Sequence, residues 1–432
     1  MVSLRSDYCT SESFKAHLPE SFNLSVVSPA WAAYACWVVS AVVIRRFIDR
    51  EADSSTFVPL DSRYIDGHIP AKVRRPLLDQ LLEARVLECD NLFYFNRYFD
   101  GGPGKCLCYR LGEGHRDSNI YARDITHPEL LRKIARFADK ERDAITDPIH
   151  LALRRWHDQV EVLPTAPHGE HPLLDNLIDG ERRFTVCAQG RVHTNVANLP
   201  RQYRQFLRLD KQELFSCDVS TSQPLLLGLL LQKNKETRGE CRGRVGRGER
   251  GSHEAVFNPY SDSSLNVFLE DCLSGTVYDR IATATGYLRD DVKSMFLAVI
   301  YGHPDHMHTK VGLAIRDLYP DVFNAVVELN YELGHGGLPK LMQKQESRVM
   351  IGRVAARLIR DYPAMPLLTV HDSVLVPEEF AAAATNVIRE EWIAEFGVEP
   401  GVKTSGFMAP QSPREKRSRR PRPQTLGVPM AC

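Results

Sequence analysis

Two aspartates in this chain, Asp218 and Asp372, are each expected at the end of a buried strand. Asp372 is at the centre of residues 367–377 (LLTVHDSVLVP), where two apolar runs flank a short polar turn. Apolar β-branched runs are typical of buried strands, so this segment predicts a hairpin with Asp372 at its tip. Asp218 ends a second strand-like run, residues 215–219. Asp372 alone fits an ordinary turn residue, but two such carboxylates favour a shared metal site.

A pair of aspartates on adjoining strands suits divalent metal ions. Two bare carboxylates about 4 Å apart repel by about 4 kcal/mol at an intermediate effective dielectric, and a bound cation removes that repulsion. Mg²⁺ prefers carboxylate and phosphate oxygens, and Mn²⁺ is the alternative ion. Two ions in such a site clamp the attacking and leaving oxygens of an in-line phosphoryl transfer. Asp218 and Asp372 therefore predict this chemistry, with two Mg²⁺ ions as cofactors.

A helix with an unusual face is predicted between the two aspartates. Within residues 288–302, Arg289, Lys293, Leu297 and Tyr301 recur every four residues and so lie along one stripe. Two cations, an apolar side chain and an aromatic ring suit a nucleoside triphosphate, with the cations on its phosphates and Tyr301 at its sugar and base. Taken alone, the stripe is better explained by a partly exposed helix with snorkelling cations. The order carboxylate, cationic helix, carboxylate is much more specific than any one part.

This order resembles that of the family A polymerases, the bacterial DNA polymerase I type and the related single-subunit phage RNA polymerases. The matching segments are Asp218-Val219-Ser220 with Gln223 for motif A, Arg289-x-x-x-Lys293 with Tyr301-Gly302 for motif B, and Val370-His371-Asp372 for motif C. The segments around Arg191-Val192-His193-Thr194 and Gln343 are similar to family regions near the primer–template minor groove. The resemblance covers residues 184–407 in the family's order.

The resemblance implies an α+β fold, a right-hand palm with trimmed fingers and a helical thumb, and template-directed nucleotidyl transfer. Its partners would be a DNA primer–template and deoxynucleoside triphosphates. The resemblance also implies a role for each site residue. Metal ions would be bound by Asp218, Val219 and Asp372, and the triphosphate by Arg289 and Lys293, with Lys293 also protonating pyrophosphate. The nucleotide pocket would be formed by Gln223, Leu297 and Tyr301, and the primer–template would be contacted by Arg191, Gln343 and His371.

Several residues depart from the family pattern. Gln223 stands where the DNA enzymes usually carry a glutamate that excludes a ribose 2′-hydroxyl; the size is kept and the charge is lost. Ser373 follows Asp372, as in the phage RNA polymerases, and Leu297 replaces a position that is often aromatic. An RNA polymerase or primase-like enzyme is therefore the alternative within the class. No acidic motifs of a proofreading domain are found upstream, which indicates a specialised polymerase of a mobile element, phage or plasmid.

The N-terminal part of the chain predicts a nucleic-acid-binding module. In residues 57–112 a helical stretch precedes two expected strands, 92–98 and 105–111, joined by a Gly-Gly-Pro-Gly turn. Helices followed by such a hairpin resemble a winged helix. Lys72, Arg74 and Arg75 lie near the helix that would contact DNA, where clustered cations favour phosphates. The alternatives are a small structural module and, for the whole chain, a non-catalytic nucleic-acid-binding protein.

The remaining segments complete the expected organisation. Residues 1–56 are expected to form an N-terminal helical segment, 113–183 a thumb-like helical connector, 184–408 the palm and fingers, and 409–432 a disordered basic tail. Residues 233–252 are rich in arginine and glycine and predict a mobile loop. The apolar stretch 26–44 contains serines and a proline, so we expect a buried helix rather than a membrane span.

Composition places the chain among globular proteins. Its 432 residues allow two domains, the 43% hydrophobic content is enough for real cores, and the formal net charge is zero. The ten cysteines show no paired metal spacing. Together with a polar start that lacks a secretory signal, they indicate a cytoplasmic protein with no membrane partner.

Overall fold

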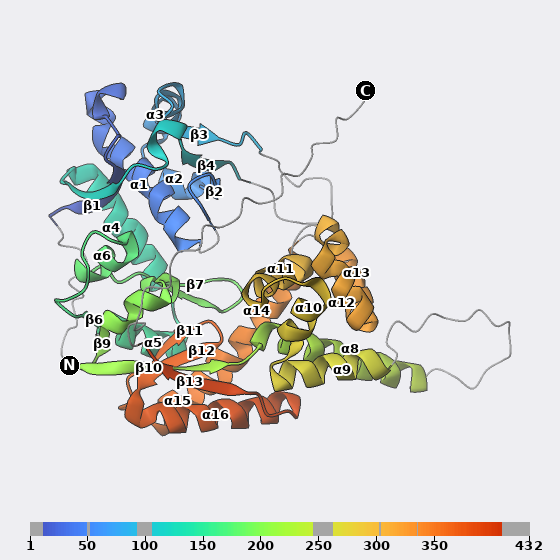
Figure 1. Cartoon of the computed structure of the whole chain (residues 1–432). Coiled ribbons are helices and arrows are strands. Elements are labelled where there is room, and N and C mark those ends of the chain that lie inside the picture. Colours follow the sequence, from blue (N-terminus) through green and yellow to red (C-terminus); the bar gives the residue numbers. More distant parts are fainter. Residues whose placement is uncertain are drawn as a thin grey trace, which may run out of the picture.

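The computed structural model describes residues 12–49, 52–92, 106–244, 262–301, 304–334 and 336–407. Helices are combined with sheets whose strand pairs, among these residues, are all antiparallel, an arrangement compatible with the α+β class. The N-terminal and C-terminal parts of the chain form separate layers, with the longest sheet and its helices at the end away from the N-terminal part (Figure 1). The predicted tail, residues 409–432, lies outside the described residues.

The N-terminal part has its own hydrophobic core, which runs in sequence from Ala16 to Leu130. It therefore draws on the predicted N-terminal segment, the winged-helix-like module and the connector alike. Its elements are β1 (Phe14–Pro19), α1 (Ala32–Ile48), β2 (Val58–Pro59), α2 (Ser62–His68), α3 (Ala71–Glu83), β3 (Leu87–Cys89), β4 (Cys108–Leu111), β5 (Ile120–Ile125) and α4 (Pro128–Asp143). Strand β1 pairs with β5, and a second sheet has the order β2-β4-β3.

The apolar stretch near the start of the chain forms α1. By length and composition Pro29–Ile48 could cross a membrane, and it is the one such helix among the described residues. Nine residues of α1 are buried, among them Val38 and Val39, and its Ser40 hydroxyl accepts a hydrogen bond of 2.9 Å from the backbone N–H of His17 in β1. In the structure this helix is thus the centre of the N-terminal core.

The winged-helix-like module contains a strand that was not predicted, β3 (Leu87–Cys89), and the strand expected at 92–98 lies, apart from its first residue, outside the described residues. The Asp90 carboxylate accepts hydrogen bonds from the backbone N–H groups of Leu92 and Cys108, and Asn91 has a left-handed φ of 52°. This local turn ends the strand at Cys89, because a left-handed residue breaks the extended backbone.

The C-terminal part is built on a six-stranded sheet of order β11-β12-β10-β9-β6, in which β13 also pairs with β10. The strands are β6 (Glu161–Val162), β9 (Leu207–Leu209), β10 (Gln212–Val219), β11 (Leu368–Val370), β12 (Ser373–Pro377) and β13 (Val402–Gly406). Helix α16 (Glu378–Phe396) covers one face, where Trp392 is fully buried. Helix α16 directly follows the hairpin strand β12, and β13 returns to pair with β10.

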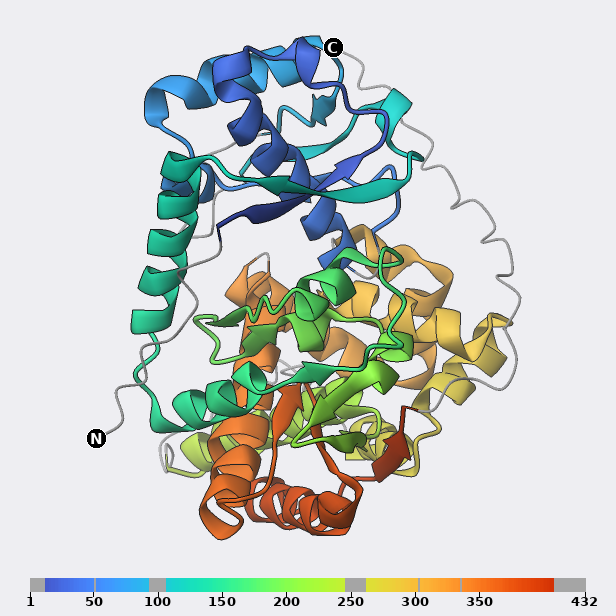
Figure 2. The same ribbon diagram turned by 90° about the vertical axis from the view of Figure 1, so that its left-hand side faces the viewer.

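Shorter elements connect the two parts. They are α5 (Pro148–Asp158), α6 (Pro172–Ile178), β7 (Phe184–Val186), β8 (Val192–Thr194) and α7 (Asn195–Asn198). Helix α4 extends along one side from the N-terminal part toward the large sheet (Figure 2). The Lys15 ammonium in β1 donates a hydrogen bond of 2.7 Å to Asp179, which follows α6, so an ion pair crosses between the two parts.

A helical layer packs beside the large sheet. Its helices are α8 (Ser222–Arg244), α9 (Asp262–Ser274), α10 (Val277–Thr285), α11 (Arg289–Tyr301), α12 (Lys310–Leu318), α13 (Pro320–Leu333) and α14 (Gly337–Val349), and α14 continues through Met350–Ala355 into α15 (Ala356–Asp361). The predicted loop at 233–252 is wrong in its first half, since α8 continues to Arg244. Lysine, glutamate and arginine favour helix as strongly as most residues, so a polar run can extend an apolar helix.

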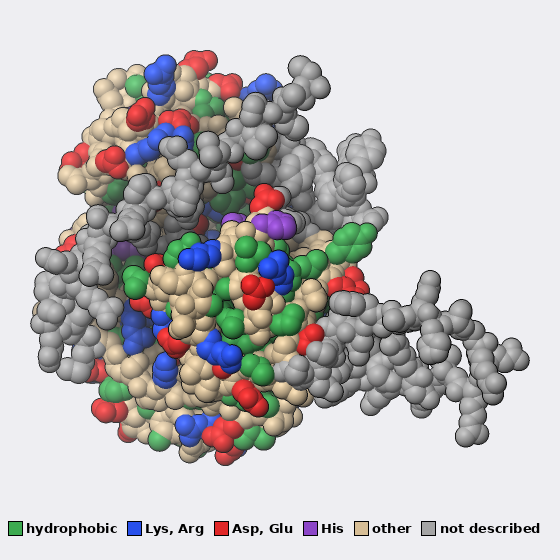
Figure 3. All heavy atoms as spheres, turned by 45° about the vertical axis from the view of Figure 1, so that its right-hand side comes forward, with side chains coloured by type: hydrophobic (Ala, Val, Ile, Leu, Met, Phe, Trp, Pro, Cys, Tyr) green, Lys and Arg blue, Asp and Glu red, His purple; other side chains and the backbone are tan. Residues whose placement is uncertain are grey.

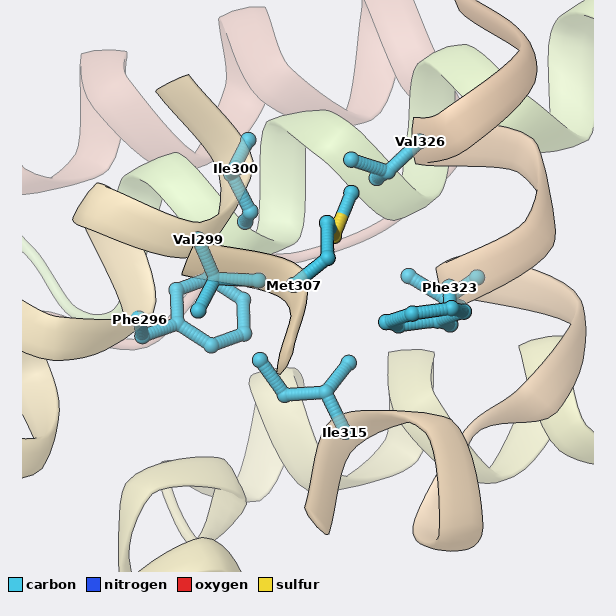
Figure 4. Close-up of a pocket in the computed structure, with 8 residues that line it drawn as sticks. Phe296, Val299, Ile300, Met307, Ile315, Phe323 and Val326 are labelled. Atoms are coloured by element: carbon cyan, nitrogen blue, oxygen red, sulfur yellow. The ribbon is translucent and has the colours of Figure 1, made fainter. Parts of the chain in front are cut away.

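Helix α11 is fixed in this layer by apolar contacts on its inner face. Phe296, Val299 and Ile300 point toward side chains of the neighbouring helices (Figure 4). They line a cavity of about 10 Å³, which is barely the size of one water and has a wholly apolar lining. The cavity is a packing gap and not a ligand site. The Phe296 ring also lies 6.3 Å from that of Phe268, centroid to centroid.

Replacing Phe296 with alanine tests how far this packing stabilises the helix. Phe296→Ala should lower the free energy of unfolding by about 3–5 kcal/mol, since it removes a fully buried aromatic ring. Met295→Ala, on the exposed side of the same helix, should change it by less than about 0.5 kcal/mol. Denaturant unfolding measures both, and equal losses would contradict the assigned packing.

Candidate active site

The two predicted aspartates lie at the same end of neighbouring strands. Asp218 of β10 is the register partner of Ser373 in β12, and the backbone N–H of Val219 donates a hydrogen bond of 3.3 Å to the Asp372 carbonyl. The predicted hairpin is present as β11 and β12, whose connecting turn is His371-Asp372. His371 has a left-handed φ of 54°, as hairpin turns of two residues require at their first position. Asp372 therefore stands at the tip, beside the end of β10.

The two carboxylates interact electrostatically. Burial, and next the negative charge of Asp372, raise the pKa of Asp218 to about 7. The positive charges of Lys293, Arg201 and Lys403 act in the opposite direction. A cation bound between the carboxylates would relieve the same repulsion, so the pair has the electrostatic character of a metal site.

A hydroxyl at the start of α8 completes this edge of the sheet. The Ser222 side chain is buried and donates a short hydrogen bond to Asp372. Thr221, just before it, has a left-handed φ of 50° and donates a hydrogen bond of 2.6 Å to the Cys272 carbonyl. The chain thus turns sharply from β10 into α8, and the partial positive charge of the helix N-terminus favours the carboxylate next to it.

The donor set fits a divalent ion that shares its coordination with substrate. Asp218 and Asp372 offer carboxylate oxygens, and Val219 follows Asp218 at the end of the strand, as the resemblance requires. Among the described residues, no group of three or more His, Cys, Asp or Glu side chains could hold a metal ion. Two carboxylates suffice for Mg²⁺ where phosphate oxygens and water supply the other ligands. The site has no full protein cage of its own.

The predicted cationic helix is α11, and its four stripe residues differ in their surroundings. Lys293 is exposed, and its charge acts on Asp218. Arg289 forms an ion pair of 3.1 Å with Asp279 of α10. Leu297 and Tyr301 are partly buried against the hydrophobic core. The helix therefore brings one of its two cations within electrostatic reach of Asp218, while Gly302 lies outside the described residues.

A buried polar network lies at the other end of α11. The Tyr301 hydroxyl donates to the Gln223 side-chain carbonyl, and the Gln223 amide donates to the Glu346 carboxylate, both in short hydrogen bonds. Arg191 donates two hydrogen bonds to the same carboxylate, at 3.0 and 2.6 Å. Gln223 and Tyr301 are thus brought together as the resemblance implied. Arg191, predicted to contact primer–template, is paired with a protein carboxylate here.

Burial also changes the ionisation of this network. Burial is the main reason that the pKa of Glu346 is raised to about 7; the charge of Arg191 acts to lower this pKa, and that of Asp372 acts to raise it. Burial raises the pKa of Tyr301 as well, with the charge of Glu346 acting in the same direction, so its hydroxyl keeps its proton at neutral pH. Asp372 thereby links the network electrostatically to Asp218.

The other two predicted nucleic-acid contacts lie nearby in the fold. Gln343 is partly buried on α14, one helical turn before Glu346, and His371 is partly buried in the hairpin turn next to Asp372. Both therefore belong to elements that carry site residues.

Four site residues were missed by the sequence reasoning: Ser222, Glu346, Arg201 and Lys403. Ser222 follows Asp218 in a polar run between strand and helix, which is a recognisable place for a capping hydroxyl. Lys403 becomes the register partner of Asp218 only once β13 pairs with β10. Glu346 stands in a run of polar residues, 343–348, and nothing local marks it as buried.

Comparison with known proteins gives no match, either to a protein-family model or to a curated protein sequence.

The raised pKa of Asp218 predicts a stability gain when the charge is removed. The folded protein keeps the Asp218 proton up to about pH 7, whereas the unfolded chain releases it near 3.8. Folding thus takes up a proton in this window, and wild-type stability falls as pH rises through it. In EDTA at pH 8, Asp218→Asn should therefore raise the Tm by about 2 °C or more.

The pH dependence distinguishes stabilisation by removal of the Asp218 charge from a stabilisation that any substitution could cause. The advantage of Asp218→Asn should grow between about pH 4 and pH 7 and then level off. Asp210→Asn is the matched control, because Asp210 is exposed in the turn before β10 with a left-handed φ of 50°, which asparagine also tolerates. Thermal unfolding followed by circular dichroism measures all three proteins. An advantage that was independent of pH would contradict the raised pKa.

Proposed function

We propose that this protein is a template-directed nucleotidyltransferase, most simply a DNA-directed DNA polymerase that adds deoxynucleotides to a primer. The observation that carries the proposal is the pair of electrostatically coupled aspartates, Asp218 and Asp372, with the charge of Lys293 acting on the same site. The order of the corresponding motifs along the chain supports it independently.

The residues have distinct roles in the proposed reaction. The primer 3′-hydroxyl attacks the α-phosphorus, the bond to the bridging oxygen of the β-phosphate breaks, the hydroxyl proton passes to solvent, and pyrophosphate leaves. Asp218 and Asp372 would hold Mg²⁺, which when bound lowers the charge repulsion and orients the phosphate oxygens. Lys293 would donate a proton to the departing pyrophosphate, and Arg289 would exchange Asp279 for the triphosphate.

The polymerase architecture belongs to the same proposal. The sheet that contains β10, β12 and β13 would be the palm, the helices from α8 to α13 the fingers, and α4 with α5 a thumb-like arm. This assignment agrees with the position of the aspartates at one end of the sheet and of α11 beside them. DNA would then enter over His371 and α14, with Arg191 and Gln343 near the primer terminus.

The N-terminal part is proposed to bind DNA as a winged-helix-like module. The order β2, α2, α3, β3, β4 with sheet order β2-β4-β3 supports that assignment. Lys72 and Arg75 on α3 are exposed, whereas Arg74 forms an ion pair with Asp66. On the described part of the face in Figure 3, basic side chains are scattered among acidic ones, so duplex binding would depend on local sites of this kind.

We prefer DNA synthesis to RNA synthesis because the serine at position 373, an argument for RNA synthesis, has a structural explanation. A serine after the motif C aspartate is similar to the phage RNA polymerases. Here, however, the Ser373 hydroxyl donates a hydrogen bond of 2.9 Å to the Val370 carbonyl across the hairpin turn. A structural role in the turn explains serine at this position without reference to the sugar of the substrate.

Primer extension in Mg²⁺ tests the proposal, with deoxynucleotides and ribonucleotides offered separately. We expect extension with deoxynucleotides, and a loss on the order of 100-fold or more in Asp372→Asn because the metal site is broken. Asp210→Asn should extend as the wild type does. A preference for ribonucleotides would identify an RNA-synthesising enzyme. Duplex binding without incorporation from any primer would contradict the proposal and leave a non-catalytic nucleic-acid-binding protein.

A further inference from the structure

The Glu346 carboxylate of α14 is hydrogen-bonded to Gln223, one of the two residues expected at the nucleotide sugar. It is 1% exposed on α14 and accepts the two Arg191 hydrogen bonds and one from Gln223. Gln223 in turn accepts from Tyr301. Four parts of the chain therefore meet in one network: the start of α8, the end of α11, the middle of α14 and the residue before β8.

The hydrogen bonds from Tyr301 to Gln223 and from Gln223 to Glu346 all run the same way, from donor to acceptor, and Glu346 determines this direction. Above its raised pKa the Glu346 carboxylate is ionised and can only accept hydrogen bonds, so Gln223 presents its NH₂ group to it. The carbonyl oxygen of the same amide then faces Tyr301, whose hydroxyl must donate to it. With both ends of its amide bonded, Gln223 is held in one orientation, because any rotation of the side chain would leave buried polar groups unpaired.

We propose that Glu346 is a positioning residue that fixes Gln223 and thereby sets the discrimination between deoxyribose and ribose in the incoming nucleotide. This inference rests on the proposed polymerase function, in which Gln223 lies against the sugar. A glutamine free to rotate could swing aside and admit a 2′-hydroxyl, whereas one held from both ends cannot. Glu346 also supplies a negative charge next to Gln223, where the DNA enzymes usually carry a glutamate, and the charge of Arg191 balances it.

The main test variant is Glu346→Gln, which keeps the size of the side chain. A neutral amide can either donate to Gln223 or accept from it, so the direction of the network is lost, and the ion pair with Arg191 is removed. We expect the ratio of kcat/KM for a deoxynucleotide to that for its ribonucleotide to fall about tenfold, chiefly through a lower KM for the ribonucleotide. The ratio is the readout, because a change in primer–template binding alone would affect both nucleotides equally. A tenfold change corresponds to about 1.4 kcal/mol, the size of one hydrogen bond.

Two further variants make the test decisive. Tyr301→Phe removes the hydroxyl that donates to Gln223 and should also lower the ratio, which keeps the proposal testable if Glu346→Gln fails to fold. Lys344→Gln, on the exposed side of α14, is the matched control and should leave the ratio unchanged. Circular dichroism verifies that each variant is folded.

The outcomes separate this inference from the proposed function. If the folded Glu346→Gln and Tyr301→Phe proteins lose activity equally with both sugars, so that the ratio is unchanged, Glu346 has only a structural role and the inference is wrong. If the wild type incorporates neither kind of nucleotide while still binding duplex, the proposed function itself fails. A fall in the ratio alone supports both.

Discussion

The repulsion between Asp218 and Asp372 is the constraint on which the rest of this site depends. Two carboxylates at the same end of neighbouring strands are unfavourable unless something compensates their charge. The fold supplies partial compensation from several directions, through the Ser222 hydroxyl and the start of α8 at Asp372, and through three cations whose fields reach Asp218. Burial and the remaining repulsion from Asp372 still raise the pKa of Asp218 to about 7. A site left in this state by its own fold is well prepared for a metal ion.

Much of the frame around the site could be predicted because its signals are local. The hairpin at 367–377 follows from two apolar runs around a polar turn, and α11 follows from a stripe of residues that recur every four positions. The position of Asp372 at the tip needed no long-range information. The winged-helix-like part was less predictable, since β3 has only three residues before the left-handed Asn91 and is too short to show an apolar pattern.

The buried network could not be predicted for a physical reason. Arg191 and Glu346 are 155 residues apart in sequence, and each belongs to a segment whose local pattern is ordinary. Their pairing exists only because β8 and α14 pack against the same core. The resemblance suggested a nucleic-acid contact for Arg191, but the sequence gives no sign of which carboxylate, if any, is near enough to hold it. Buried polar pairs of this kind depend on tertiary packing, and local patterns are silent about them.

A direct measurement of metal binding tests the central claim that Asp218 and Asp372 form one divalent-cation site. Mn²⁺ binding followed by electron paramagnetic resonance would be measured in the full chain with primer–template and a non-hydrolysable deoxynucleotide analogue. Two specifically bound ions are expected in the wild type, and both should be lost when Asp218 and Asp372 are replaced together by asparagine. Specific Mn²⁺ binding that persists unchanged in that double variant, or its absence from the wild type, would contradict the account.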